Sequence, residues 1–161
     1  MGVRIAFIGA TTEELDRAEK DPSWASSCVS GLYADVAFPK AARPYGGPDK
    51  AWAGLQFLLD ETGIELEFLM DGFQILEDGT LFGWSAEQIE SVARQLQATP
   101  WERLAAHYDP ERMTIERMYP NVWGWDAEGG LDWLQCSYDE LVTFFAAAAE
   151  GGYGAFMSFS F

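Results

Sequence analysis

Both ends of the chain carry the alternating apolar pattern of β-strands. Near the N-terminus, Val3, Ile5 and Phe7 fall on one side of a strand predicted over 3–8. The final stretch, 153–161, alternates serine with large apolar residues in the same way. Helix signals fill the chain between them, so the end strands belong to a sheet that helices cover. We therefore predict an α/β fold, a single three-layer α-β-α domain over residues 1–161 with a mixed sheet flanked by helices, and α+β as the alternative.

Helix start signals are clear inside the chain. In a capping box a serine or threonine precedes glutamate or glutamine by three residues, as at Ser85 with Gln88 and Ser137 with Glu140. Proline directly after Asp109 is a further start signal. The predicted helices cover 11–20, 24–32, 49–61, 85–97, 100–107, 110–117 and 137–150.

Residues 64–84 are predicted to be extended, with a turn at Asp78–Gly79. On such a strand Glu65 and Glu67 share one face, with side chains about 7 Å apart. That spacing suits a divalent cation or glycoside hydrolysis. A solvated strand face opposite Ile64 and Leu66 is the simpler interpretation.

The helix at 49–61 carries an apolar stripe headed by Trp52, which must be buried. Gln56 falls at the edge of that stripe, near Asp49 and Asp60. Its amide either contacts a ligand or bonds a neighbouring backbone. Lys50 lies beside Asp49 at the start of the same helix. A functional site at this polar edge of the helix is therefore one hypothesis.

Charge is strongly negative and unevenly distributed. The net charge is −16, and residues 51–93 hold nine acidic residues without a lysine or arginine. Such a surface repels phosphate backbones, so we expect no nucleic-acid partner. A basic protein partner is compatible with it, as is a role in solubility alone. The sequence has no apolar run long enough to span a bilayer and no signal-peptide pattern, which predicts a cytoplasmic protein without membrane contact.

The reactive side chains are few. Cys28 and Cys136 are far apart, which indicates neither a disulfide framework nor a thiolate metal site, and we predict two buried, inert thiols. The sole histidine, His107, is predicted at a helix end. We expect no metal and no cofactor.

The connection from Tyr119 to Trp133 is dense in aromatic residues. Trp123 and Trp125 lie between them, next to Asn121 and acidic residues. Such a segment can line a pocket, present a protein-binding face or plug one end of the core. A cleft between this segment and the Asp49 end of the preceding helix would favour a site.

Several motifs together resemble the bacterial YfbM-like family. They are "DKAWAGLQFLL", "LFGWSAEQIESVARQL", "MYPNVW" and "YDELVTFFAAAAEGG", in that order over nearly the whole chain. The resemblance implies a three-layer α-β-α domain whose biochemical activity is not established. Gln56 stands where members of the family commonly carry histidine. Because glutamine cannot titrate near neutral pH, a shared catalytic base at this position is doubtful, whereas a hydrogen-bonding role is retained.

Three functions follow as hypotheses. The leading one is a non-enzymatic acidic binding protein, of immunity or regulatory type, that engages a basic protein partner. The alternative is a small-molecule-binding domain or enzyme with a pocket between the 49–60 helix and the 119–133 aromatic loop. The third is a structural subunit, and either a monomer or a homodimer is expected. The candidate site residues are Asp49, Lys50, Trp52, Gln56, Tyr119 and Trp123.

Overall fold

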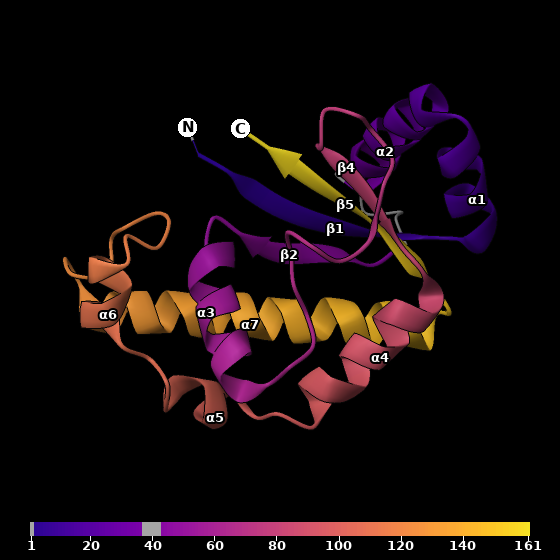
Figure 1. Cartoon of the computed structure of the whole chain (residues 1–161). Coiled ribbons are helices and arrows are strands. Elements are labelled where there is room, and N and C mark those ends of the chain that lie inside the picture. The colour runs from indigo at the N-terminus through magenta and orange to yellow at the C-terminus, as the bar shows by residue number, and fades with distance from the viewer. Residues whose placement is uncertain (1, 37–42) are drawn as a thin grey trace.

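The computed structural model describes residues 2–36 and 43–161 (Figure 1). Helices dominate it, and one sheet joins the two ends of the chain. The elements are β1 (Arg4–Ala10), α1 (Thr12–Lys20), α2 (Pro22–Val36), β2 (Tyr45–Asp49), α3 (Trp52–Thr62), β3 (Phe73–Gln74), β4 (Leu81–Trp84), α4 (Ala86–Gln97), α5 (Trp101–Ala105), α6 (Pro110–Ile115), α7 (Ala127–Glu150) and β5 (Gly154–Ser160).

The sheet has the order β2-β1-β5-β4-β3, and each pair of neighbouring strands in the described chain is antiparallel. Arg4 pairs with Ser160 and Ala10 with Gly154, which brings the two ends of the chain side by side (Figure 1). The predicted mixed sheet is therefore wrong, and the fold is α+β, the alternative. Alternation of apolar residues shows that a segment is a strand, but it does not give the direction of the neighbouring strand. The three-layer stacking stays a prediction.

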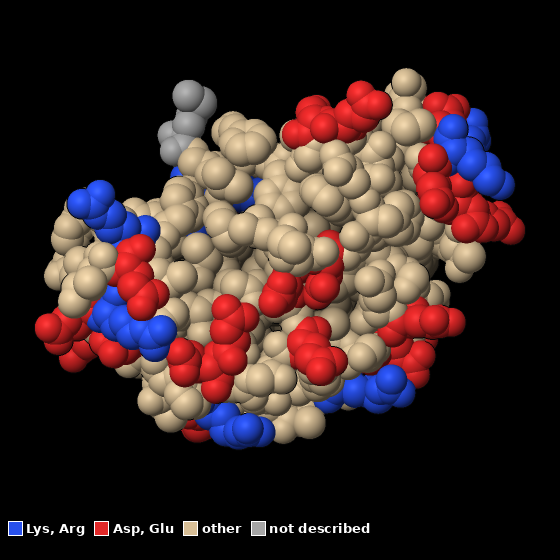
Figure 2. Space-filling model, in the orientation of Figure 1, with Lys and Arg blue, Asp and Glu red and all other residues tan. Residues whose placement is uncertain are grey.

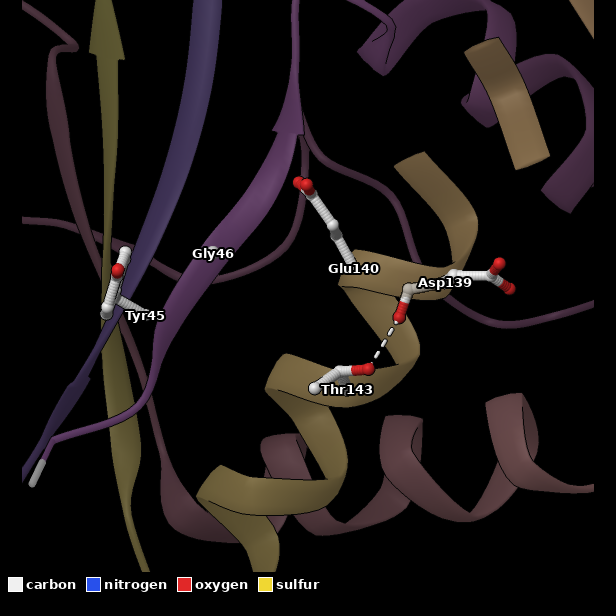
Figure 3. A pocket seen from close by; sticks show the side chains of 5 residues that line it. All are labelled: Tyr45, Gly46, Asp139, Glu140 and Thr143. Atoms are coloured by element: carbon white, nitrogen blue, oxygen red, sulfur yellow. Dashed lines mark hydrogen bonds between the residues drawn. The ribbon is translucent and has the colours of Figure 1, made fainter. Parts of the chain in front are cut away.

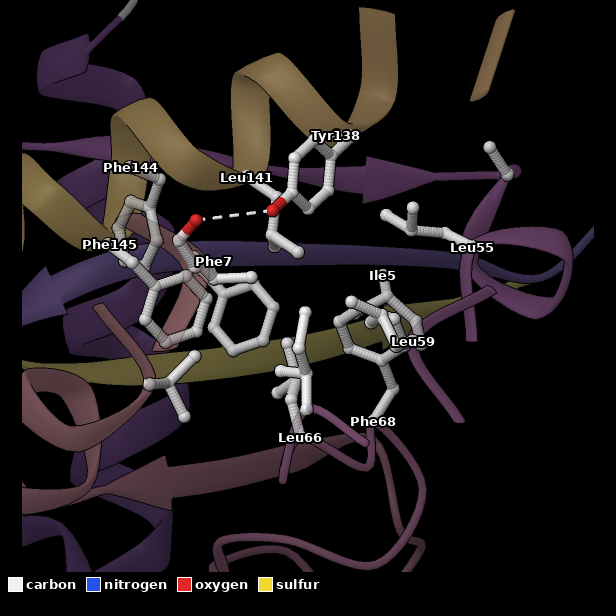
Figure 4. Close-up of a cluster of buried hydrophobic side chains, with 14 of the residues drawn as sticks. Ile5, Phe7, Leu55, Leu59, Leu66, Phe68, Tyr138, Leu141, Phe144 and Phe145 are labelled. Carbon is white, nitrogen blue, oxygen red and sulfur yellow. Dashed lines mark hydrogen bonds between the residues drawn. The ribbon is translucent and has the colours of Figure 1, made fainter. Parts of the chain in front are cut away.

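Side chains of β1 alternate between two clusters of buried residues. Ile5 and Phe7 belong to the larger cluster, which α3, α4 and α7 complete, whereas Ile8 joins residues of α1 and α2 in the smaller one. Phe7 lies at the centre of the larger cluster, with ring centroids 5.5 Å from both Phe144 and Phe145 of α7 (Figure 4). The sheet thus packs against α7 through aromatic rings, and leucines of α3 complete the same cluster.

Helix α7 begins well before the predicted start at Ser137. Its N-cap is Asp126, whose carboxylate accepts a 2.9 Å hydrogen bond from the backbone N–H of Gly129. Two glycines in the first turns argue against a helix by propensity alone. Gly130 is buried where a Cβ would lie 2.7 Å from the Tyr108 hydroxyl and 3.3 Å from the Trp123 ring, so close packing against these side chains favours glycine.

The stretch after α3 also differs from the prediction. Residues 64–72 are not part of the sheet, so Glu65 and Glu67 do not share a strand face. The turn at Asp78–Gly79 is confirmed: Gly79 has φ 73°, and the Asp78 carboxylate accepts from the backbone N–H of Thr80 at 2.9 Å. The remaining predicted helices form with shifted ends, and α2 extends beyond the predicted 24–32.

Both thiols were predicted to be buried, and neither is. Cys136 is exposed on α7, and Cys28 is half-buried on α2. Burial and the neighbouring Glu14 carboxylate raise the pKa of the Cys28 thiol. Cys28 is thus a poor nucleophile at neutral pH.

Candidate functional site

The start of α3 is a tight turn at the end of an edge strand. Asp49, the last residue of β2, has φ 48°, and its carboxylate lies 3.7 Å from the Arg4 guanidinium on the neighbouring strand. The Asp49 side chain is 63% exposed, so this ion pair is weak. Lys50 is half-buried in the turn that follows. Asp49 is thus directed to Arg4 rather than to Gln56.

Trp52 and Tyr119 join α3 to the aromatic loop. Their rings are stacked, with centroids 5.9 Å apart and planes inclined by 24°. Both side chains are half-buried, and the indole N–H of Trp52 is buried without a hydrogen-bond partner among the described residues. The Tyr119–Pro120 peptide bond is cis. These two candidate residues therefore lie together, and their role in binding stays a prediction.

Gln56 binds the backbone of the segment that follows its own helix. Its amide N–H₂ donates to the carbonyl of Leu66 and to the Asp60 carboxylate, both at 2.8 Å. Its amide oxygen accepts from the backbone N–H of Phe68 at 3.0 Å. Of the two roles open from the sequence, the structure shows backbone binding. A glutamine suits it, because one side chain must both donate and accept.

Trp123 is a core residue. It is fully buried, its indole N–H donates to the carbonyl of Met118 at 2.9 Å, and its ring stacks on Trp133 at 5.8 Å. The ring also lies so close to Gly54 of α3 that a Cβ there would overlap it. Of the predicted set, Trp52, Tyr119 and Trp123 therefore meet along α3, whereas Gln56 and Asp49 face other partners.

An acidic pocket of about 510 Å³ lies at the end of α3. Its lining is two-thirds carboxylate side chains from α3 and from the segment that Gln56 holds. The lining residues are Asp60, Gly63, Ile64, Glu65, Glu67 and Asp71. From the sequence, Asp60 was noted beside Gln56, and Glu65 with Glu67 was weighed as a cation or hydrolytic pair against a solvated strand face. Asp71 was not singled out, and the absence of lysine and arginine over 51–93 was the available signal for the whole group.

A second pocket, of about 420 Å³, is apolar and lies between α6 and the start of α7. Ile115 of its lining is 74% exposed, and Trp125, which follows the lining residue Gly124 in the chain, is 85% exposed. Trp125 was noted with the aromatic loop but not singled out, because the sequence does not show that it and Trp123 differ in burial. The lining residues are Pro110, Glu111, Thr114, Ile115, Trp123, Gly124 and Ala127.

A third pocket, of about 490 Å³, lies between the edge strand β2 and α7. Figure 3 shows Glu140 extending along β2, while Asp139 points away from the strand. Thr143 donates its hydroxyl to the Asp139 carbonyl at 2.8 Å, which is an ordinary bond within a helix. Gln56 lines none of these three pockets.

The described residues also bear on metal-binding and membrane-spanning functions. No group of three or more His, Cys, Asp or Glu side chains in residues 2–36 and 43–161 is arranged to hold a metal ion. Over the same residues, no helix has both the length and the apolar character to cross a membrane.

Comparisons with known proteins place the chain in a family without a defined activity. A search of curated proteins found no match. A solved structure, "The Crystal Structure of a Protein of Unknown Function YfbM from Escherichia coli", superposes with a TM-score of 0.67 at 14% identity, over 98% of this chain and 99% of that one. At that identity the likeness concerns the fold. Residues 1–157 match the family described as "Domain of unknown function (DUF1877)", and the chain belongs to this family.

Proposed function

We propose that this domain is a non-enzymatic, cytoplasmic binding protein of immunity or regulatory type whose acidic surface engages a basic protein partner. The observation that carries the proposal is the pocket in which Asp60, Glu65, Glu67 and Asp71 converge. Opposite charge on a partner would accelerate association and exclude acidic competitors.

The acidic segment is held in a defined shape, which supports a binding role. Gln56 fixes the backbone at Leu66 and Phe68, and the Asp71 carboxylate accepts from the backbone N–H of Glu67 at 2.9 Å. Leu66 and Phe68 are fully buried beneath it. A surface fixed in this way loses little conformational entropy when a partner binds.

Among the charged side chains on the face seen in Figure 2, those near the middle are mostly acidic, and lysine and arginine lie mostly toward the margins. Next to the pocket, Leu69 and Met70 are 57% and 76% exposed. Apolar side chains surrounded by carboxylates suit a partner that combines lysine or arginine with apolar residues.

The test compares two variants that change the net charge equally. Glu65→Gln with Glu67→Gln alters the pocket, and Asp16→Asn with Glu19→Gln alters exposed acids of α1. We expect the unmodified protein to retain basic proteins at about 50 mM salt, and to lose them at about 300 mM, in a pull-down. The pocket variant should retain about tenfold less, whereas the α1 variant should behave like the unmodified protein.

Two results would contradict the proposal. One is a retained partner that is indifferent to salt. The other is equal loss in the two variants, because then net charge rather than this surface governs binding. Circular dichroism of both variants checks that the fold is intact.

A further inference from the structure

The apolar pocket beside α6 has the composition of a contact site for another protein. Pro110, Thr114, Ala127 and the buried Trp123 line it together with the exposed Ile115. Trp125, which directly follows the lining residue Gly124 in the chain, is exposed as well. Tryptophan is among the residue types that contribute most binding energy at protein interfaces, and this one is largely exposed. Isolated exposed apolar residues are common, but here they adjoin one pocket.

The walls of this pocket are fixed by hydrogen bonds. Asp109 caps α6 by accepting from the backbone N–H of Arg112 at 2.9 Å. On the other side Asp126 caps α7, and the Tyr108 hydroxyl donates to the Ala127 carbonyl at 2.8 Å. Because these walls are formed before any partner arrives, an apolar side chain can enter without ordering them.

The surroundings of the pocket are negatively charged. Glu111 lines it, and residues 109–128 hold five acids against two arginines. Arg112 is already engaged: its guanidinium donates to Glu116 at 2.8 Å and to Glu61 of α3 at 3.0 Å, and both hydrogen bonds raise its pKa. With Arg112 paired to glutamates, Arg117 is the remaining positive charge in residues 109–128. An occupant that carries positive charge is therefore favoured over a neutral or acidic one.

The Arg112–Glu61 pair also connects this pocket to the acidic one. Glu61 directly follows Asp60, which lines the acidic pocket, so α6 is fastened to the same end of α3. A second copy of the chain is a poor occupant, because two molecules of net charge −16 repel each other.

We infer that the pocket between α6 and α7 receives an apolar side chain from a lysine- or arginine-containing segment of another protein, with Trp125 and Ile115 covering it. This inference rests on the proposed function, since it assigns the apolar part of the contact with the same basic partner. The acidic pocket would then attract the basic partner, and the apolar pocket would discriminate among basic segments.

Two synthetic peptides of equal length and charge test the inference by calorimetry. One alternates leucine with lysine, and the other alternates serine with lysine. We expect the unmodified protein to bind the leucine peptide at least about tenfold more tightly. Trp125→Ala and Ile115→Ser should each remove most of that preference. Phe161→Ala, which truncates a 76% exposed aromatic residue at the C-terminus, is the matched control and should keep it.

The outcomes separate the two proposals. The inference about the apolar pocket is overturned if the unmodified protein binds both peptides with equal affinity, or if Trp125→Ala weakens the binding of both peptides equally. The proposed function still stands in that case if Glu65→Gln with Glu67→Gln weakens the binding of both peptides. If the glutamine substitutions change neither affinity, the proposed function fails, and so does the assignment of both pockets to one partner. A dimer in sedimentation that Trp125→Ala dissociates would show that a second copy is the occupant and overturn the inference.

Discussion

Gln56 holds the segment after α3 by both ends of its amide. It donates to the Leu66 carbonyl and accepts from the Phe68 N–H, so it replaces the strand neighbour that this segment lacks. A buried backbone group left without such a partner costs about 1–3 kcal/mol. The structural role of this residue is therefore substantial, even though the acidic pocket that it supports is proposed to bind a partner.

Replacing Gln56 with alanine should lower the free energy of unfolding by about 2 kcal/mol, because two backbone groups lose their partner. Urea unfolding measures the change. Gln97→Ala, on an exposed position at the end of α4, serves as control and should change stability by less than about 0.5 kcal/mol. A Gln56→Ala protein as stable as the control would show that water replaces these bonds without loss.

Packing between α3 and the aromatic loop decides how closely the two elements approach. Gly54 gives the Trp123 ring room to lie against the helix backbone, and Trp52, two residues earlier, stacks on Tyr119. A glycine inside a helix is normally unfavourable by about 1 kcal/mol relative to alanine. Its presence here follows from the contact rather than from the helix.

Two glycine-to-alanine substitutions should have opposite effects. Gly54→Ala forces a methyl group into the Trp123 ring and should destabilise the protein by about 2 kcal/mol or more. Gly31→Ala, in α2, meets no described atom within 4 Å and should stabilise by about 0.5–1 kcal/mol. Thermal unfolding of both variants provides the measurement. A stabilising Gly54→Ala would contradict the close approach of Trp123.

Two capping motifs of the same pattern, at Ser85 and at Ser137, have different outcomes in the structure. Ser85 and Gln88 form the predicted capping box with bonds of 2.9 and 3.1 Å, so α4 begins where expected. The same pattern at Ser137 and Glu140 lies inside α7, because Asp126 caps the helix earlier and Gly130 and Leu134 of the added turns are buried. A capping motif permits a helix start, and packing determines whether the chain uses it.

Electrostatic repulsion acts on the molecule as a whole. There are 26 acidic residues against 10 lysines and arginines, and every charged residue in 51–93 is acidic. Self-repulsion of this kind destabilises the compact state, and dissolved salt screens it.

Raising the salt concentration from about 0.01 M to about 1 M should therefore increase the melting temperature, because the screening length falls from about 30 Å to about 3 Å. Glu65→Lys with Glu67→Lys reduces the net charge from −16 to −12, since each substitution adds two positive charges. This variant should gain less from salt than the unmodified protein. Equal gains, or a loss of stability with salt, would show that repulsion in this region is unimportant.

The sequence by itself determined the end strands, most of the helix starts, the buried stripe of α3 and the excess of negative charge, because each depends on residues that are neighbours along the chain. Tertiary structure decided the antiparallel direction of the sheet, the early start of α7 and the partners of Gln56. It also decided that Trp123 is buried while Trp125, two residues later, is exposed. These features depend on contacts between distant segments, and periodicity within one segment does not specify which distant segment covers it.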